Sequence, residues 1–179
     1  MSTRPAASDG TIPAGPRWHR IIDSPLGPIT LVIEAAGRLT GLYLEGQRYR
    51  PVASEFGVRD DHVADDVVAQ LGEYFAGHRT RFDLDLAPHG TAFQRRVWQG
   101  LTAVPCGSTT TYGALAASLG MGTGSGRAVG AAVGRNPISI VVPCHRVLGR
   151  DGSLTGYSGG LDRKRWLLRH EGAIPDAAA

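Results

Sequence analysis

The residues with the most distinctive chemistry lie together in one short segment. Residues 138–147 have the sequence ISIVVPCHRV, in which an apolar run leads into Pro143 and then a Cys-His-Arg cluster. The pattern predicts a strand ending before Pro143, because the residue before a proline stays extended and proline suits the start of a helical turn. Cys144 would then lie near free backbone N–H groups, which lower the pKa of a thiol. The segment therefore indicates a nucleophilic cysteine with an imidazole beside it.

Cys144 also allows other interpretations. A free cysteine is usually a buried structural thiol, and a thiol with an imidazole occurs in Cys-His hydrolases as well. Neighbours in an extended chain point to opposite sides, so His145 would reach the thiol through a water molecule or a helical turn. A basic imidazole also needs a carboxylate to fix its tautomer. The carboxylates nearby in sequence belong to Asp151, Asp162 and Glu171, and spacing does not choose among them.

Charge divides the chain into two halves of opposite sign. Residues 1–88 hold nine arginines and twelve acidic residues, whereas residues 89–172 hold nine arginines, one lysine and three acidic residues. The halves therefore carry −3 and +7, and Asp176 completes the overall +3. The basic half predicts binding to a polyanion, although a basic surface without a specific partner has the same composition.

Length and composition exclude several classes of protein. The chain has 179 residues and is 42% hydrophobic, which suits one or two globular domains and not a disordered chain. No run approaches the roughly 18 apolar residues of a membrane span, and the N-terminus has no signal-peptide core, so we expect a cytoplasmic protein without membrane contact. Cys106 and Cys144 are too few for a disulfide framework or a four-cysteine zinc site.

The first half predicts an α/β domain. Antiparallel strands are expected at residues 20–22, 29–33 and 39–44, with a further short strand near residues 82–86. Between them, apolar residues at positions 63, 67, 71 and 75 mark one face of a helix that Gly77 ends.

The second half predicts mainly helices. Thr91 is a suitable N-cap for a helix whose apolar residues at positions 93, 97 and 101 share a face. Two short helices, Tyr112–Leu119 and Arg127–Val133, flank the glycine-rich turn GMGTGSG. This is the outline of a helix-turn-helix.

Two segments frame the helical domain. Pro88-His89-Gly90 is the predicted linker, and a last helix is predicted from Asp162, as its N-cap, to His170, with Gly172 just past its end. The predicted boundaries are residues 1–16 for a flexible leader, 17–88 for the N-terminal α/β domain, 89–172 for the C-terminal domain and 173–179 for a tail.

Several motifs in the second half form a specific combination. They are PCHRV (143–147), YSGGL (157–161), RAVG (127–130), Asn136-Pro137 and the closing His170-Glu171-Gly172. Together they resemble the O6-alkylguanine-DNA alkyltransferase family, and the resemblance is dense in motifs from about Thr91 to Gly172. PCHRV with YSGG at this spacing is characteristic of that family.

The resemblance implies a fold and an activity. The fold would be an α/β N-terminal domain of ribonuclease-H-like shape and a mainly α-helical C-terminal domain with a helix-turn-helix. The protein would flip O6-alkylguanine, and O4-alkylthymine as well, out of double-stranded DNA and transfer the alkyl group irreversibly to its own cysteine, once per molecule. We expect a monomer that binds the minor groove and needs no cofactor or metal, with clustering on DNA left open.

The resemblance also implies roles for individual residues. Cys144 would be the nucleophile and alkyl acceptor, His145 the base acting through water, and Glu171 the residue that orients His145. Asn136 would hold the turn before the active-site strand, and Tyr112 would donate to the purine ring or push the adjoining phosphate. The expected contacts to DNA and the flipped base come from Arg127 in the vacated space, Tyr157 and Ser158 at the base and its O6 atom, Gly159 and Gly160 at points of close approach, and Val147.

The sequence departs from the family pattern at a few positions. Gly126 stands where a small helix former is usual, and Ala114 stands where a longer polar residue is common. The N-terminal half has no cysteine, so the structural zinc of some animal relatives is not expected, and Cys106 matches no functional position. The competing hypotheses are a related binding module, which would lack Cys144, and a Cys-His hydrolase, which would not need a basic helix-turn-helix.

Overall fold

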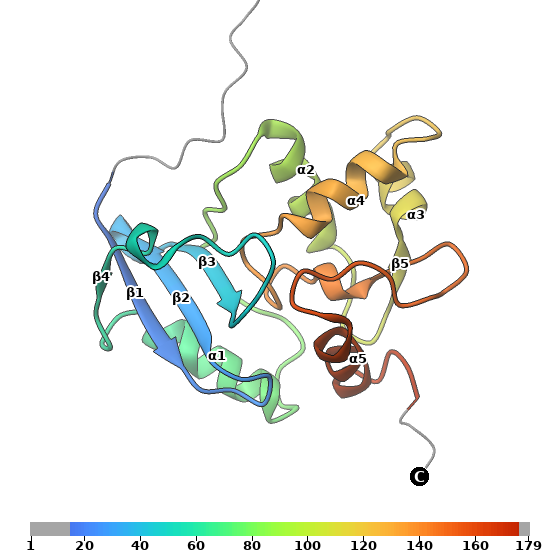
Figure 1. The fold of residues 1–179 in the computed structure, drawn as a ribbon. Coiled ribbons are helices and arrows are strands. Elements are labelled where there is room, and N and C mark those ends of the chain that lie inside the picture. The colour runs from blue at the N-terminus through green and yellow to red at the C-terminus, as the bar shows by residue number, and fades with distance from the viewer. Residues whose placement is uncertain (1–14, 176–179) are drawn as a thin grey trace, which may run out of the picture.

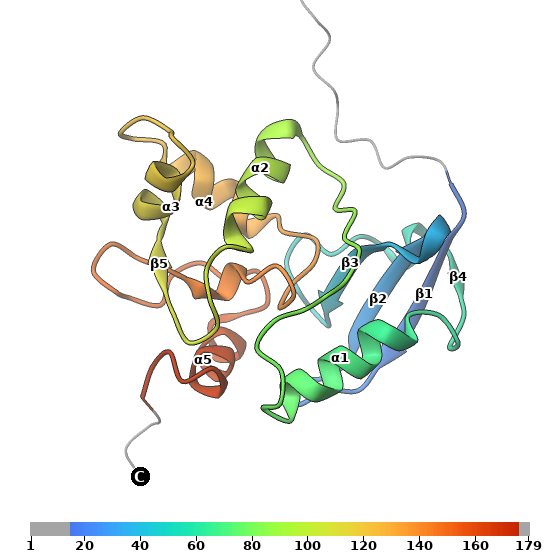
Figure 2. The same cartoon turned by 180° about the vertical axis from the view of Figure 1, so that it is seen from behind.

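The computed structural model describes residues 15–175, so residues 1–14 of the predicted leader and 176–179 of the predicted tail lie outside the described residues. A sheet with one long helix on its face forms one side of the molecule, and the remaining helices form the other (Figures 1 and 2). Of the helices in the described residues, none is long and apolar enough to cross a membrane.

The N-terminal sheet has four strands in the order β3-β2-β1-β4. The strands are β1 (Arg17–Ile22), β2 (Ile29–Glu34), β3 (Leu39–Leu44) and β4 (Val58–Arg59). The first three pair antiparallel, as the sequence predicts, and β4 adds a short parallel pairing to β1. The first strand begins at Arg17, earlier than the predicted residue 20.

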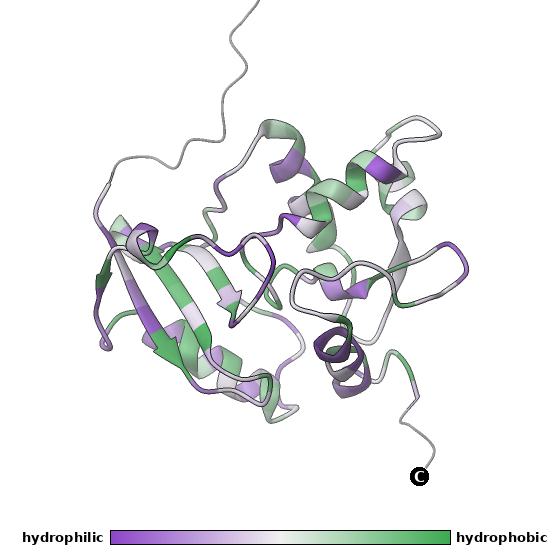
Figure 3. Cartoon of the chain, viewed as in Figure 1, coloured by the Kyte–Doolittle hydropathy of each residue, from purple (hydrophilic) through white to green (hydrophobic). Residues whose placement is uncertain are grey.

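Strand β2 is buried on both faces of the sheet. Alternate side chains point to opposite faces, so neighbouring residues of β2 pack in different clusters. Ile29, Leu31 and Ile33 belong to the main core, which also holds the apolar face of helix α1 (Asp65–Phe75). Val32 packs on the other face in a smaller cluster. Strand β2 is accordingly coloured as apolar along most of its length in Figure 3, whereas helix α5 (Leu161–His170) is mostly hydrophilic.

The predicted strand at residues 82–86 is wrong. This segment forms only a single bridge, between Leu86 and Leu39. The side chain of Gln70 on α1 instead binds both the N–H and the carbonyl of Asp83, each at 2.8 Å. A backbone held by a helix side chain at that point cannot continue a strand ladder.

The C-terminal half holds the remaining elements. They are α2 (Ala92–Leu101), β5 (Thr110–Thr111), α3 (Tyr112–Ser118), α4 (Gly126–Gly134), a 3-10 turn (Cys144–Arg146), β6 (Val147–Leu148) and α5. Thr91 is the N-cap of α2, since its hydroxyl accepts from the N–H of Gln94 while the Gln94 side chain accepts from the N–H of Thr91. This confirms the predicted cap.

The predicted N-cap of the last helix, Asp162, is wrong by two residues. Gly160 occupies the N-cap position of α5 with a φ of 94°, a conformation that favours glycine. Asp162 lies in the first helical turn and pairs with Arg165 at 3.0 Å. A carboxylate in that turn still stabilises the helix through its dipole. Gly172 follows the helix in the left-handed region with a φ of 70°, as predicted.

The two halves share one core. The N–H of Leu42 on β3 donates to the carbonyl of Pro137 at 2.8 Å, and the N–H of Ser139 donates to the carbonyl of Leu42 at 3.1 Å. Buried residues of both halves belong to the same hydrophobic cluster. The segment that leads to Cys144 is therefore fixed to the edge of the N-terminal sheet.

Candidate active site

The segment before Cys144 is a buried loop and not the predicted strand. Only Ile138 forms a bridge, to Leu42, and Ile140 lies in the left-handed region with a φ of 71°. The Asn136 side chain explains this shape. Its amide oxygen accepts from the N–H of Ile138 at 3.0 Å, and its Nδ2 donates to the carbonyl of Val142 at 2.8 Å. By holding both ends of residues 138–142, Asn136 closes them into a compact loop.

Cys144 is the first residue of the 3-10 turn and is almost completely buried. The same Nδ2 of Asn136 lies 3.1 Å from its Sγ and donates to it. Burial raises the pKa of the Cys144 thiol, although the Asn136 donor, the charge of Lys164 and backbone N–H groups act in the opposite direction. The expectation of a lowered thiol pKa is therefore wrong for this state of the protein. A base is needed to remove the proton.

His145 and Glu171 form a buried pair with the chemistry of such a base. Nε2 of His145 lies 2.8 Å from Oε1 of Glu171, and both side chains are fully buried. Burial lowers the pKa of His145, so the imidazole rests neutral. With Nε2–H donated to the carboxylate, Nδ1 is left as the acceptor, and Nδ1 is a buried atom without a hydrogen-bond partner among residues 15–175.

Arg146 fixes the Glu171 carboxylate from another side. Its Nε donates to Oε2 at 2.8 Å and its Nη2 donates to Oε1 at 2.9 Å. Burial alone would raise the pKa of Glu171, but the hydrogen bonds and charges of His145 and Arg146 hold it well below its usual range. Glu171 is therefore ionised and orients the imidazole. Asp151 and Asp162, the other carboxylates near in sequence, bind Ser153 and Arg165 instead.

Lys164 is a site residue that the sequence analysis missed. It is fully buried, and its Nζ donates to the carbonyls of Val147 at 2.5 Å and Thr155 at 2.7 Å. Burial lowers its pKa to about 8. Lys164 lies three and four positions before Leu167 and Leu168, so all three share the buried face of α5. This helical periodicity is the signal in the sequence that could have identified Lys164.

Tyr112 lies at the start of α3 and faces the loop after β6. Its hydroxyl lies 3.2 Å from the carbonyl of Thr155 and 3.3 Å from that of Gly156. Gly130 of α4 faces the Tyr112 ring, because a Cβ at this glycine would lie 3.5 Å from that ring. Tyr112 therefore joins α3, α4 and the loop that Lys164 also holds.

The YSGG segment contributes two buried hydroxyls, and that of Tyr157 interacts electrostatically with Cys144. The hydroxyls of Tyr157 and Ser158 are buried atoms that lack a hydrogen-bond partner within the described part of the chain. A Cβ at Gly159 would come within 2.7 Å of both Leu44 and the Tyr157 ring, so a larger residue there would force these side chains to shift. Gly160 is the N-cap of α5.

Two of the expected DNA-binding residues differ in their surroundings. Arg127 is the second residue of α4 and is exposed. The side chains of Cys144, His145 and Glu171, called the relay below, are buried instead. Val147 is fully buried in β6, where its carbonyl accepts from Lys164. Helix α4 begins at Gly126, so the glycine at this position does not delay the start of the helix.

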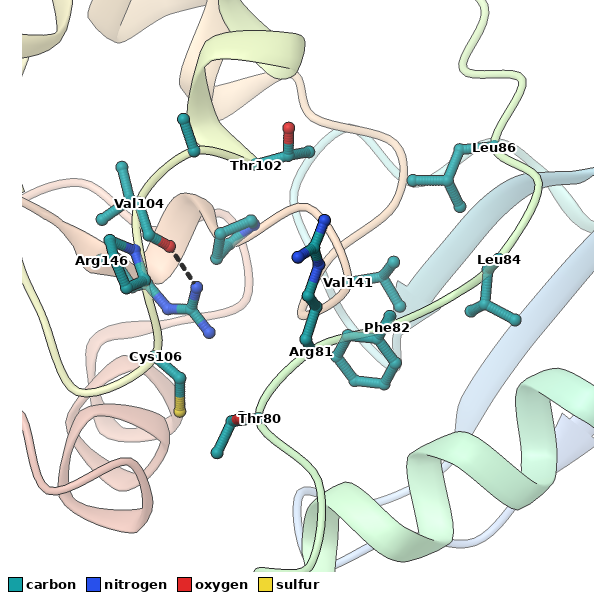
Figure 4. A pocket seen from close by; sticks show the side chains of 13 residues that line it. Thr80, Arg81, Phe82, Leu84, Leu86, Thr102, Val104, Cys106, Val141 and Arg146 are labelled. Atoms are coloured by element: carbon teal, nitrogen blue, oxygen red, sulfur yellow. Dashed lines mark hydrogen bonds between the residues drawn. The ribbon is translucent and has the colours of Figure 1, made fainter.

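A cavity of about 670 Å³ is lined by residues of both halves (Figure 4). Phe82, Leu84 and Leu86 line it from the N-terminal half, and Arg146 and Cys106 line it from the other. Cys144 is not among the described residues that line it. No cluster of three or more metal-ligating side chains occurs in residues 15–175.

Each half of the chain matches the model of a known protein domain. Residues 18–88 match the model of the ribonuclease-like domain of 6-O-methylguanine DNA methyltransferase, and residues 92–173 match the model of the DNA binding domain of the same protein. The chain belongs to this methyltransferase family. The resemblance noted in the sequence is thereby confirmed, as is the order of a ribonuclease-like domain followed by a DNA-binding domain.

Relatives within the methyltransferase family cover nearly the whole chain. A methylated-DNA–protein-cysteine methyltransferase of Salmonella typhimurium is 49% identical over 86% of this chain and 94% of its own length. One from Mycobacterium tuberculosis is 48% identical over 86% and 91%. The crystal structure of Mycobacterium tuberculosis OGT in complex with DNA is 46% identical, covers 87% of this chain and 93% of its own, and superposes with a TM-score of 0.80.

Proposed function

We propose that this protein repairs alkylated double-stranded DNA directly, by transferring the alkyl group from O6 of guanine to Sγ of Cys144. The observation that carries the proposal is the buried arrangement of Cys144, Asn136, His145 and Glu171 in a chain of the methyltransferase family. Attack on an sp³ carbon needs a soft nucleophile, and a thiolate is the best that a protein offers.

The atoms of the transfer balance without a cofactor. A bond forms between Sγ of Cys144 and the alkyl carbon, and the bond from that carbon to O6 breaks. The thiol proton passes through water to Nδ1 of His145, the buried nitrogen that faces no protein partner in the described residues. The guanine anion that leaves takes up a proton, for which Tyr112 is the proposed donor. Water then returns a proton to Tyr112 and removes the one held by His145, so both side chains end as they began. The product thioether is stable, so each molecule reacts once.

We infer that the damaged base reaches Cys144 by flipping out of the duplex. The buried thiol cannot reach a stacked base, and the unpartnered hydroxyls of Tyr157 and Ser158 are suited to bind a base and its O6 atom. Gly159 and Gly160 would allow close approach of the base, and Val147 would form part of the wall of the pocket that receives the flipped base. The same pocket would accept O4-alkylthymine, which presents an alkylated oxygen at a comparable position.

Helices α3 and α4 are proposed to form a helix-turn-helix on the minor groove. The exposed Arg127 at the start of α4 would enter the space left by the flipped base. This half of the chain carries the +7 balance, which favours DNA. The sheet with α1 is proposed to have a ribonuclease-H-like shape, and the protein is proposed to bind as a monomer.

Incubation with a duplex that holds one O6-methylguanine with a labelled methyl group tests the function. We expect one label per protein molecule, with no further turnover. Binding without transfer would favour a non-catalytic module, and neither binding nor transfer would favour a hydrolase. Cys144→Ala serves as the control, because it should keep affinity for DNA within a few fold and transfer nothing.

A further inference from the structure

Tyr74 of the N-terminal half reaches into the relay of the C-terminal half. It lies near the end of α1 on the same buried face as Val67 and Leu71, and it is 1% exposed. Its hydroxyl donates to Oε1 of Glu171 at 2.8 Å, across 97 positions of sequence. A buried tyrosine hydroxyl needs a partner, and this one has the carboxylate that orients His145.

Oε1 of Glu171 is shared by three donors. Tyr74, His145 and Arg146 approach it at 2.8, 2.8 and 2.9 Å, whereas Arg146 is the one donor to Oε2 among residues 15–175. Arg146 and His145 lie within the PCHRV motif beside the thiol, so Tyr74 is the donor that comes from the other domain. Its hydrogen bond falls on the same oxygen that holds the imidazole.

The ring of Tyr74 is held in place by other rings. Its centroid lies 5.4 Å from those of Phe75 and Phe82 and 5.1 Å from that of His170. Nε2 of His170 on α5 is also 2.7 Å from the carbonyl of Tyr74. The hydroxyl is therefore presented to Glu171 by packing between α1 and α5.

We propose that Tyr74 is a positioning residue of the transfer reaction, through which the N-terminal domain holds the Glu171 carboxylate and sets the basicity of His145. This inference rests on the proposed function. A donor on Oε1 withdraws electron density from the oxygen that stabilises the imidazolium. Tyr74 therefore favours the neutral imidazole, which is the form that accepts the thiol proton.

Other charged or titratable groups also face this relay and stay unchanged when the Tyr74 hydroxyl is removed. They are Arg146, Lys164, Cys144, Cys106, Tyr157 and His170. Burial and then Glu171 raise the pKa of Tyr74, so the phenol remains a donor throughout the working range of pH. A change in pH dependence after loss of the hydroxyl is therefore assigned to His145 and its carboxylate.

The test is the single-turnover rate of Tyr74→Phe with free O6-benzylguanine, measured between about pH 5 and 9, around the ordinary titration range of histidine. With this free base, the measured rate does not depend on DNA binding or base flipping. In the plot of rate against pH, the rate falls on the acid side where His145 becomes protonated; this part of the curve is the acid limb. We expect Tyr74→Phe to move the acid limb to higher pH by about half a pH unit or more, as a lost hydrogen bond to a charged group would do. Tyr43→Phe is the matched control, because Tyr43 is a buried tyrosine of the same domain that packs on the opposite face of the sheet.

An acid limb that stays in place in a folded Tyr74→Phe protein would overturn the proposal and leave Tyr74 a packing residue. Fluorotyrosine at position 74 supplies a second test, since a more acidic phenol is a stronger donor and should move the limb to lower pH. If the wild-type protein fails to alkylate Cys144 at all, the proposed function is wrong. If it alkylates Cys144 and neither variant moves the limb, only the role of Tyr74 is wrong.

Discussion

Replacing Glu171 by glutamine should be among the most damaging conservative changes in this protein. The carboxylate is fully buried and accepts hydrogen bonds from Tyr74, His145 and twice from Arg146. Glutamine keeps the shape but removes the negative charge, and its NH2 group would face either the three donors at Oε1 or the Arg146 donor at Oε2. The Arg146 guanidinium, with 6% of its side chain exposed, would be left buried without a counter-charge.

The size of the effect follows from that burial. Removing one partner of a buried ion pair costs about 3–5 kcal/mol, because the remaining charge stays desolvated. In a chain of this size, 1 kcal/mol corresponds to roughly 2–4 °C in Tm. We therefore expect Glu171→Gln to lower Tm by roughly 6–20 °C. Transfer to Cys144 should also fall at least tenfold at a temperature where the variant is still folded (about 1.4 kcal/mol).

Glu34→Gln is the matched control for Glu171→Gln. Glu34 also contacts an arginine, Arg38, and a histidine, His89, but these partners have 47% and 23% of their side chains exposed. Water can solvate them after the change, so the cost should be about 1 kcal/mol or less. Urea unfolding of both variants beside the wild type measures the difference. Equal losses at the two positions would refute the reasoning from burial.

The free energy of unfolding at acid pH gives an independent check that Glu171 is ionised. Because its folded-state pKa lies below the ordinary value of 4.5, the unfolded chain binds the proton more tightly. The stabilisation is present above about pH 4.5 and is lost as pH falls below it. The difference in unfolding free energy between wild type and Glu171→Gln should therefore shrink in acid. A difference that stays constant down to pH 3 would contradict an ionised, strongly held carboxylate.

The remaining predictions concern DNA, the second cysteine and the buried lysine. Arg127→Ala should slow repair of O6-methylguanine in duplex DNA by tenfold or more, on the scale of unstacking, while the rate with free O6-benzylguanine stays near normal; equal slowing on both would mean damage to the active site. Binding to duplex DNA should weaken with salt by roughly 0.9 log units per log of salt for each phosphate neutralised, and a flat response would exclude the basic half as the binding surface. Cys106→Ser should transfer nearly normally, and a complete loss would give this thiol a role. Because the Lys164 pKa is lowered from 10.5 to about 8, wild-type stability should rise with pH across that interval, and Lys164→Met should lack the rise; a rise in the variant as well would assign it to another group.

Local signals in the sequence predicted several elements correctly. Thr91 with Gln94 forms the expected N-terminal cap, and the helix face that includes Val67 and Leu71 lies in the core. Helix propensity, in contrast, was a weak guide at Gly126. Helix α4 begins there despite the glycine because its buried face, with Val129 and Val133, packs in the core.

Long-range contacts explain what the sequence analysis could not predict. The β-branched run before Pro143 favours a strand, but the Asn136 side chain binds both ends of it and closes a loop. Lys164 stands between two arginines, a context typical of a surface residue. Only its position on the same helical face as Leu167 and Leu168 indicates that it is buried. The contact of Tyr74 with Glu171 joins two domains, and no local pattern contains it. The same burial that creates these contacts also raises the pKa of Cys144, against the expectation from backbone donors.

The most direct measurement is the mass of the peptides of this protein after reaction with a duplex that holds O6-methylguanine. Alkyl transfer to Cys144 predicts that the peptide containing Cys144 gains the mass of one methyl group and that Cys106 stays unmodified. The repaired guanine should appear in equal amount, and the reaction should stop when the protein is consumed. Methyl groups on Cys106, repaired guanine in excess of protein, or an unmodified Cys144 would contradict the proposed function.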